Sequence, residues 1–268
     1  MTKGSEKTTR KGWFGRLYMA LIIVLLYAPL VILIVCSFNA SKQRSVWGGF
    51  TFHWYRDMIA NEEIMSAVTT SLILTTTSAL TACLIGTMVC VGMTVLGRKA
   101  KGYIRMTSNI PLLNADIVTG ISIMILFAYF LSLGYASVFI AHVTLGLPYV
   151  ILNVYPRIIN MNNNIYEAAL DLGASSFLAF RKVVFPEILP GMIAGFFYAF
   201  TISMDDFVVT YFSKGPGMNT ISTMLYQQLR RGINPEMYAL STILFLAIII
   251  LLGIANRISQ TGIEEVRL

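Results

Sequence analysis

The chain is built from long apolar segments separated by short polar ones, and this pattern limits its fold more than any other feature. Hydrophobic residues make up 56% of the 268 residues and charged residues only 12%, against about 25% in soluble domains. A helix crosses a bilayer in about 20 residues, and the apolar segments are long enough for this. The sequence therefore predicts an all-α, polytopic membrane protein that forms a single transmembrane domain over residues 1–268.

Six transmembrane helices are expected, and a polar loop of about residues 158–189 separates the fourth from the fifth. The apolar run from Leu17 to Phe38 is too long for a signal peptide, and no small-residue cleavage site follows it closely. We therefore interpret this first span as an uncleaved anchor. The expected spans cover about residues 15–38, 66–96, 108–131, 137–157, 190–212 and 238–257.

The distribution of basic residues predicts the orientation, because Lys and Arg favour the cytoplasmic side of the cell membrane. With the N-terminus inside, the six spans place 14 basic residues in inner segments and 6 in outer ones. Both termini and the 158–189 loop are then cytoplasmic. Because the basic residues lie in short loops, the net charge of +7 does not indicate a nucleic-acid partner. The inner set is Lys3, Lys7, Arg10, Lys11, Arg16, Arg98, Lys99, Lys101, Arg105, Arg157, Arg181, Lys182, Arg257 and Arg267, and the outer set is Lys42, Arg44, Arg56, Lys214, Arg230 and Arg231.

The three cysteines, Cys36, Cys83 and Cys90, all lie within apolar segments. Their odd number and the absence of a Cys-x-x-Cys spacing argue against a disulfide framework or a metal site. The sequence also lacks the Gly-x-x-x-x-Gly-Lys-Ser/Thr loop that binds nucleotide phosphates, and no nucleophile–base pair stands out. We therefore expect no catalytic residues, no bound metal and no cofactor on this chain.

A short amphipathic helix is expected within the 158–189 loop. Its apolar residues recur at i, i+3, i+4 and i+7, so they share one face, and Glu167 and Asp171 project elsewhere. Such a helix either fills a groove on a partner protein or lies on lipid headgroups. Pro186 and Pro190 are expected to end a second loop helix and to begin the fifth span. The apolar stripe consists of Ile165, Ala168, Ala169 and Leu172.

The spacing of the loop residues is more specific than the amphipathic pattern. Glu167-Ala168-Ala169 precedes Gly173 by three residues, and nine further residues lead to Val183-Val184-Phe185-Pro186. This resembles the cytoplasmic EAA loop of ABC importer permeases, which docks on the ATP-hydrolysing subunit. The family pattern ends in Ile-x-Leu-Pro, and this chain keeps the apolar character with different residues. The resemblance implies that the docking residues are Glu167, Ala168, Ala169, Leu172, Gly173, Phe177 and Pro186.

Over its whole length the chain is similar to a type I ABC importer permease, and more closely to the second (C-type) permease of spermidine/putrescine importers. Besides the Glu167 loop, the matching stretches are Gly49-Phe50-Thr51, Trp54-Tyr55, Asp116-Ile117-Val118 and Ser203-Met204-Asp205-Asp206. The resemblance implies a heterodimer with a second permease subunit, two copies of an ABC ATPase that bind ATP and Mg²⁺, and an external polyamine-binding protein. Together with the lipid bilayer, these are the expected partners.

Three carboxylates lie inside the expected spans, at Asp116, Asp205 and Asp206, and no Lys or Arg lies deep in any span. A charge near the membrane centre costs about 2.5–3.5 kcal/mol on insertion scales. Acids without internal partners suggest that their partner arrives as a cation, and a polyamine fits. The alternative is that these acids are protonated, or accept hydrogen bonds from Ser, Thr or Tyr of neighbouring helices.

The fifth expected span separates the two adjacent acids. A stripe of small residues at i+4 spacing would let another helix approach closely, and a helical projection places Asp206 on this stripe. Asp205 falls about 100° away, beside Tyr198 and Thr201. We therefore expect Asp205 to face the substrate path and Asp206 a helix interface, with Tyr198 and Tyr211 able to contact an ammonium group. The stripe consists of Gly191, Gly195, Ala199 and Ser203.

Other classes of function remain open at this point. His142 in the fourth span could serve a proton relay or form a hydrogen bond to a neighbouring helix. An ABC permease for another small solute, such as an anion or a metal, would show basic or metal-ligating groups in its spans. An ion-coupled secondary transporter would need no docking loop, and no inverted repeat is visible. A membrane enzyme would need a catalytic constellation.

Overall fold

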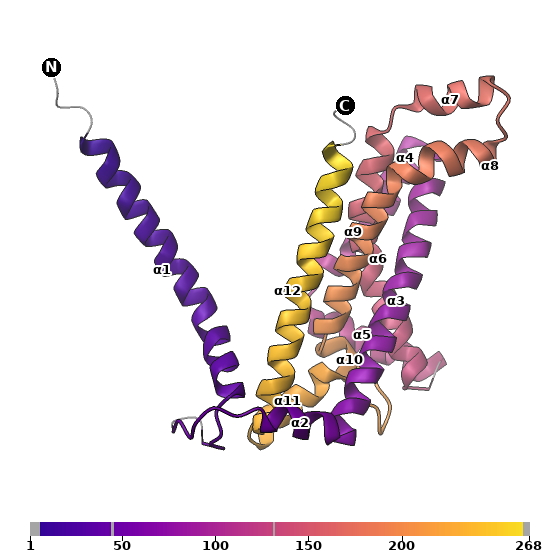
Figure 1. The fold of residues 1–268 in the computed structure, drawn as a ribbon. Helices are drawn as coiled ribbons and strands as arrows, with labels where there is room; N and C mark the ends of the chain where they lie inside the picture. Colours follow the sequence, from indigo (N-terminus) through magenta and orange to yellow (C-terminus); the bar gives the residue numbers. More distant parts are fainter. Residues whose placement is uncertain (1–5, 44–45, 131, 265–268) are drawn as a thin grey trace. The chain divides into compact units, whose positions relative to one another are not determined.

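The computed structural model describes residues 6–43, 46–130 and 132–264, and this part of the chain is helical without a β-strand (Figure 1). The predicted all-α class is confirmed. Outside the described residues lie three of the basic residues counted above, which are Lys3, Arg44 and Arg267. Residue 131, the expected end of the third span, also lies outside them. The chain divides into two compact units, which are residues 1–61 with 232–246, and residues 62–231 with 247–268.

The first unit contains α1 (Glu6–Ser37), α2 (His53–Ala60) and the beginning of α12 (Pro235–Glu264). The connection between α1 and α2 is folded around Asn39. The Asn39 amide donates to the carbonyl of Val46 at 2.8 Å, and the Trp54 indole donates to the carbonyl of Asn39 at 2.7 Å. Rings of Phe38, Phe50, Phe52 and Tyr55 pack beside it with centroids 5.0–6.0 Å apart. The short helix α2 follows this aromatic cluster and buries Trp54 and Met58.

The second unit is built on three long helices that pack against one another. These are α3 (Glu62–Val95), α6 (Tyr135–Asn160) and α9 (Phe185–Asp205). Their apolar contacts form one buried cluster, in which Ala82 of α3 lies opposite Gly146 of α6, and Gly86 of α3 lies opposite Val150 of α6. The small side chains let the helix axes approach closely, as in other membrane helix pairs.

The small-residue stripe expected in the fifth span faces α6. Gly191, Gly195, Ala199 and Ser203 are all buried, and a Cβ atom built on Gly191 would lie 2.8 Å from the backbone carbonyl oxygen of Asn153. A Cβ atom on Gly195 would lie 3.0 Å from the Cα atom of Val150. The stripe is therefore a site of direct contact between helix backbones.

Gly191→Ala should destabilise the protein, because backbone atoms cannot move aside as a flexible side chain can. Overpacking of this kind typically costs about 1–3 kcal/mol. Gly92→Ala in α3 is the matched control, because a Cβ atom there meets nothing within 4 Å. Thermal unfolding of the purified membrane complex should show a lower midpoint for Gly191→Ala alone. Equal midpoints for the two variants would contradict the close α6–α9 contact.

Two helix breaks interrupt the second unit. The helices α4 (Arg98–Leu113) and α5 (Asp116–Phe130) meet at a bend of 107°. The second break separates α9 from α10 (Val208–Ser213), because the backbone of Asp206 is extended, with φ −64° and ψ 118°. The expected spans 108–131 and 190–212 are therefore not continuous helices. Beyond α10, α11 (Ile221–Arg231) packs against α3.

Four described helices are long and apolar enough to cross a membrane, or five if the bent pair α4–α5 is one span. The four are Gly15–Ser37, Glu62–Val95, Tyr135–Asn160 and Ser176–Asp205. The sixth expected span falls in α12, whose apolar part Pro235–Ile250 is shorter. The multi-pass character is thus supported, while the count of six and the single domain over residues 1–268 stay predictions.

The segment before α9 differs from the sequence-based expectation at the prolines. The helix α8 (Ser176–Ala179), a π-helical turn (Phe180–Val184) and α9 form one helical run, so Pro186 and Pro190 do not separate a loop helix from a span. In the π turn the amide of Phe185 donates to the carbonyl of Phe180. Pro186 lies just after the π-helical turn, inside this run rather than at its start. Pro190 lies inside α9, an arrangement tolerated in membrane helices.

Candidate functional site

The two helix breaks line one pocket of about 310 Å³ in the second unit. Asp116 stands in the first turn of α5, Asp205 is the last residue of α9, and Asp206 begins the link to α10. The structure thus brings together the three acids expected inside the membrane, although about 90 residues separate Asp116 from the other two. Of the ten described residues that line the pocket, none is Lys or Arg. They are Pro111, Leu112, Asp116, Leu145, Tyr149, Ile202, Asp205, Asp206, Phe207 and Val208.

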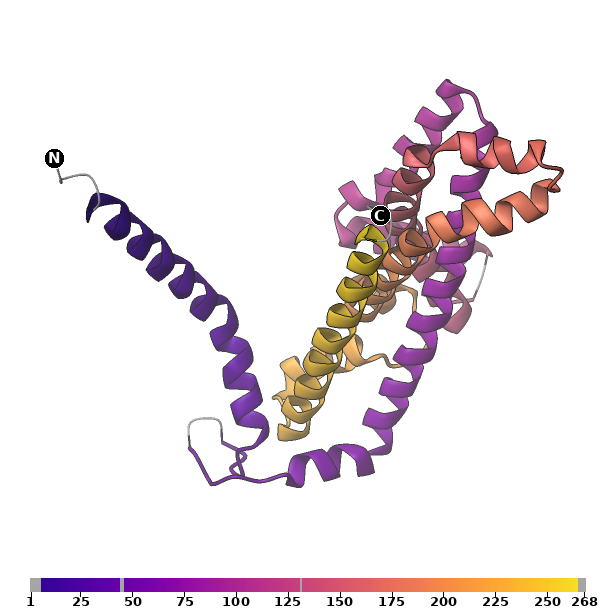
Figure 2. The ribbon, with the colours of Figure 1, turned by 45° about the horizontal axis from the view of Figure 1, so that its top comes forward.

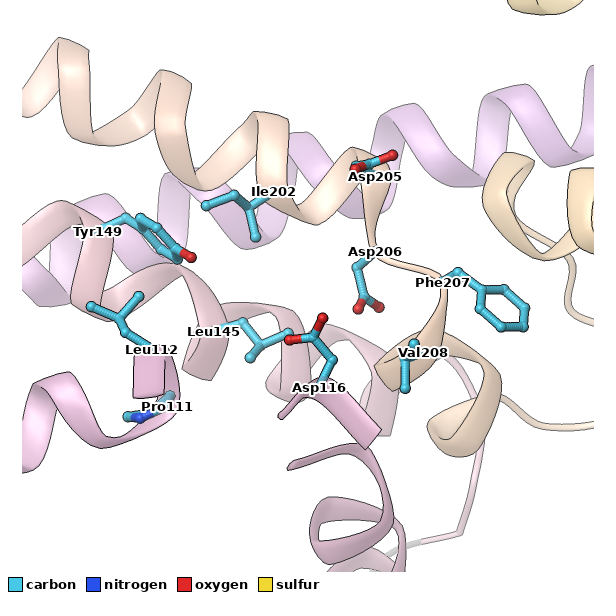
Figure 3. A pocket seen from close by; sticks show the side chains of 10 residues that line it. All are labelled: Pro111, Leu112, Asp116, Leu145, Tyr149, Ile202, Asp205, Asp206, Phe207 and Val208. Atoms are coloured by element: carbon cyan, nitrogen blue, oxygen red, sulfur yellow. The ribbon is translucent and has the colours of Figure 1, made fainter. Parts of the chain in front are cut away.

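The carboxylates of Asp116 and Asp206 turn toward each other across the pocket, whereas Asp205 lies at its edge and points away from this pair (Figure 3). Asp205 and Asp116 are exposed, and the side chain of Asp206 is only 9% exposed. The C-terminal end of α9 brings partial negative charge to the pocket and the N-terminal ends of α5 and α10 bring partial positive charge, so the helix ends offset one another and the three carboxylates set the sign. A cation is therefore the ligand that this pocket favours electrostatically.

The Asp206 carboxylate is held by the first turn of α10. Its oxygens accept hydrogen bonds from the amides of Val209 at 3.3 Å and Thr210 at 2.8 Å, and from the Thr210 hydroxyl at 2.9 Å. The carboxylate thus satisfies free amides at the N-terminal end of α10, where a negative charge is also favoured by the partial positive charge of the helix end. Asp206 thus combines a fixed position at a helix interface with a face toward the pocket. The helical projection had assigned it to the interface alone.

Tyr198 and Thr201, which the projection grouped with Asp205, are not among the residues that line the pocket. Tyr198 is 58% exposed on α9, and the Thr201 hydroxyl donates to the carbonyl of Phe197 within its own helix. Tyr211 belongs to an aromatic group with Phe207 and Tyr226, in which the rings of Phe207 and Tyr226 stack 4.2 Å apart. Their roles in the substrate path stay predictions.

Tyr149 lines the pocket from α6 and was not anticipated. Nothing in its local sequence distinguishes it from the other aromatic residues of the spans. Its position becomes visible only when α6 is placed beside the α4–α5 bend. A tyrosine ring in a negatively charged pocket can contact an alkyl chain or an ammonium group.

The loop with the Glu167 motif forms α7 (Asn163–Asp171), followed by the turn to α8, and the two helices extend from one end of the bundle (Figure 2). Asn162 caps α7 by accepting the amide of Asn164. Gly173 ends the motif with φ +85°, a conformation that residues other than glycine rarely adopt. The amides of Gly173 and Ala174 donate to the carbonyls of Leu170 and Ala169, as in a Schellman motif. Glycine is therefore the residue that this backbone conformation favours at position 173.

We define the coupling surface as the exposed apolar side chains of α7 and α8. Ile165 is 55% exposed, Leu172 89% and Phe177 74%, and Ala168 is exposed between them. Tyr166 points the other way and packs against the buried cluster of the bundle. Glu167 is exposed and borders a second pocket of about 440 Å³ between the ends of α3, α4, α6 and α7. Ala169 is half-buried, and Pro186 is exposed in α9.

Comparison with known proteins identifies the family. The profile described as "Binding-protein-dependent transport system inner membrane component" matches residues 94–264. The spermidine/putrescine transport system permease protein PotC of Escherichia coli K12 is 36% identical over 244 residues, which cover 91% of this chain and 92% of PotC. The putrescine transport system permease protein PotI of the same organism is 35% identical over 232 residues, covering 83% and 82% of the two chains.

Solved structures show the same fold at low sequence identity. A subunit of a bacterial ABC transporter that imports alginate superposes with a TM-score of 0.66 at 13% identity, covering 98% of this chain and 99% of that one. A chain of the MetNI methionine ABC transporter gives a TM-score of 0.57 at 19% identity, covering 75% and 99%. These relatives are transport subunits, and the resemblance to spermidine/putrescine permeases inferred from the motifs is confirmed. The chain belongs to the family of binding-protein-dependent transport system inner membrane components, as a multi-pass type I ABC importer permease rather than an enzyme.

Proposed function

We propose that this permease forms half of the translocation path of an ATP-driven importer of polyamines such as spermidine and putrescine. The observation that carries the proposal is the pocket at the two helix breaks, with three carboxylates and no basic side chain among its described lining residues. Irregular backbone inside a membrane is tolerated where it lines a cavity, and broken helices form substrate sites in other transporters. The similarity to PotC and PotI supports polyamines as the cation class.

The geometry suits a flexible polycation. Asp116 and Asp206 oppose each other, and Asp205 offers a further exposed carboxylate at the edge (Figure 3). A chain with amines spaced along it can pair with more than one of these acids in turn. Apolar residues such as Leu112, Leu145 and Ile202 line the wall between them, where the methylene groups of a polyamine would pack.

In the proposed assembly, the coupling surface of α7 and α8 docks on an ATPase subunit. Two copies of the ATPase bind ATP and Mg²⁺, a second permease completes the path, and an external binding protein delivers the polyamine. Exposed apolar side chains at the tip of a polar loop support a protein contact there, because a partner would remove them from water. Uptake of radiolabelled putrescine or spermidine by cells that lack this gene, with and without the plasmid-borne gene, tests the substrate class. Rescue supports the proposal, and the absence of rescue with an assembled complex contradicts it.

Both termini are proposed to be cytoplasmic, which also places the coupling surface on the side where ATP is available. The 14 to 6 distribution of basic residues supports this orientation. An alkaline phosphatase domain fused to the C-terminus, which is active only outside the cytoplasm, should therefore stay inactive. The same domain inserted after Gly217, in the turn of an expected outer loop, should be active. The reverse pattern would contradict the orientation.

A further inference from the structure

His142 lies at the centre of a buried polar network beside the α9–α10 break. The residue is 2% exposed, on α6. Its Nδ1 atom lies 2.5 Å from the Ser203 hydroxyl in the last turns of α9, and its Nε2 atom lies 2.8 Å from the Thr210 hydroxyl in the first turn of α10. One side chain therefore links the two helices on either side of the break.

The network continues to the pocket. The Thr210 hydroxyl contacts the Asp206 carboxylate at 2.9 Å, and the His142 Nε2 atom lies 3.6 Å from the same Asp206 oxygen. Ser203, Thr210 and His142 are all buried, at 6%, 0% and 2% exposure. Asp206 alone among these four lines the pocket of about 310 Å³. The network thus runs from Ser203, which is buried between the packed helices, to the Asp206 carboxylate at the pocket.

The hydrogens of the network have a consistent arrangement when Asp206 is ionised and His142 is neutral. A carboxylate only accepts, so the single hydroxyl proton of Thr210 is donated to it. The Thr210 oxygen then accepts from the N–H group at Nε2 of His142. A neutral imidazole with its proton on Nε2 has a lone pair on Nδ1, which accepts from the Ser203 hydroxyl. In this arrangement each group donates one hydrogen bond to the next, from Ser203 to His142, from His142 to Thr210 and from Thr210 to the Asp206 carboxylate.

We propose that His142 is a positioning residue of the permease, which fixes the α9–α10 break and holds the Asp206 carboxylate at the wall of the substrate pocket. This inference rests on the proposed function only in treating that pocket as the substrate path. The position of the break depends on contacts within the chain. His142 itself has no contact with the pocket lumen, so it acts through Thr210 and Asp206.

The transport test compares His142→Leu and His142→Gln with Thr144→Val. Leu removes both nitrogen atoms, whereas the Gln amide can still donate toward Thr210. Thr144 is the matched control on the same helix, because its hydroxyl donates only to the carbonyl of Ile140. For His142→Leu we expect apparent KM for polyamine to rise by about tenfold, because the buried Thr210 hydroxyl that contacts the Asp206 carboxylate loses its hydrogen-bond donor. His142→Gln should recover part of this loss, and Thr144→Val should resemble the wild type, each normalised to assembled complex.

A second test does not depend on the substrate. Val208 lines the pocket just after the break, and a Val208→Cys variant in which Cys36, Cys83 and Cys90 are Ala carries a single thiol. Its rate of reaction with a membrane-impermeant maleimide in the assembled complex reports the local geometry. Adding His142→Leu should change this rate severalfold, and adding Thr144→Val should not.

Unchanged KM together with unchanged labelling in an assembled His142→Leu complex would overturn the positioning role. If His142→Leu fails to assemble, His142→Gln is compared with Thr144→Val by the same two measurements. A His142→Gln complex with the KM and the labelling rate of Thr144→Val would then overturn the positioning role. If the wild-type complex transports no polyamine while His142→Leu still alters the labelling rate, the proposed function is wrong and the positioning role stands.

Discussion

Asp205→Asn should slow polyamine uptake about a hundredfold while the complex still assembles. The amide keeps the size of the side chain and removes its charge from the exposed end of α9 at the pocket. Asp205 is exposed in the single chain, but the second permease of the proposed assembly would cover this edge of the pocket, and an ion pair in a partly desolvated cavity matters more than a surface pair. A loss of about 2.8 kcal/mol from the rate-limiting step corresponds to this hundredfold effect. Uptake by vesicles, normalised to recovered complex, measures it.

Two further variants serve as a control and a comparison for Asp205→Asn. Glu187→Gln removes a carboxylate from the first turn of the same helix, far from the pocket lining, and should transport normally. Asp206→Asn weakens the cap of α10, because its amide nitrogen cannot accept from the backbone amides, and it also removes a carboxylate from the pocket wall, so it should reduce both the amount of assembled complex and transport per complex. Normal transport by Asp205→Asn, with a fully assembled but inactive Asp206→Asn complex, would show that transport depends on the Asp206 carboxylate and not on that of Asp205.

Gly173→Leu should separate transport from ATP hydrolysis, and this is the second large effect that we expect. The backbone of Gly173 has φ +85°, and a side chain in that conformation costs about 1–2 kcal/mol. The turn would relax and shift α7 relative to α8, so that Leu172 and Phe177 no longer share one surface. Less ATPase should co-purify, and hydrolysis should lose its stimulation by the polyamine-loaded binding protein.

Two comparisons distinguish a docking defect from general damage. Gly97→Leu, between α3 and α4, has φ −67° and open space around a Cβ atom, so it should leave coupling intact. Leu172→Asp keeps the turn and places a charge on the most exposed apolar residue of the coupling surface, and it should also uncouple. Normal co-purification and stimulated hydrolysis in both Gly173→Leu and Leu172→Asp would refute docking through α7 and α8.

Much of this site could be predicted from local sequence, for identifiable reasons. The apolar stripe of α7 follows from its spacing, and Gly173 stands where a helix end needs φ > 0°, so neither depends on distant residues. The close contact of α9 with α6 follows from small residues at i+4 spacing, because a row of small side chains on one face lets the backbone of another helix approach closely. Composition and length alone predict the all-α membrane class.

The helix breaks could not be predicted in the same way. The projection of Asp205 and Asp206 assumed a continuous helix through residue 212, but Asp206 is extended because its carboxylate caps α10 with the support of His142 and Thr210. That network joins residues from α6 and α10, which only the tertiary structure brings together. Tyr149 was missed for the same reason. The run through Pro186 depends on a π-helical turn, which has no reliable sequence signal.

The most direct test of the proposed function is uptake by proteoliposomes that contain this permease, its partner permease and the ATPase, with ATP on the side of α7 and binding protein on the other. Polyamine should accumulate only with ATP, the wild-type complex should exceed the Asp205→Asn complex about a hundredfold, and neither methionine nor an alginate oligosaccharide should accumulate. ATP-dependent accumulation of one of those solutes, or equal polyamine uptake by the two complexes, would contradict a polycation path through the pocket of Asp116, Asp205 and Asp206.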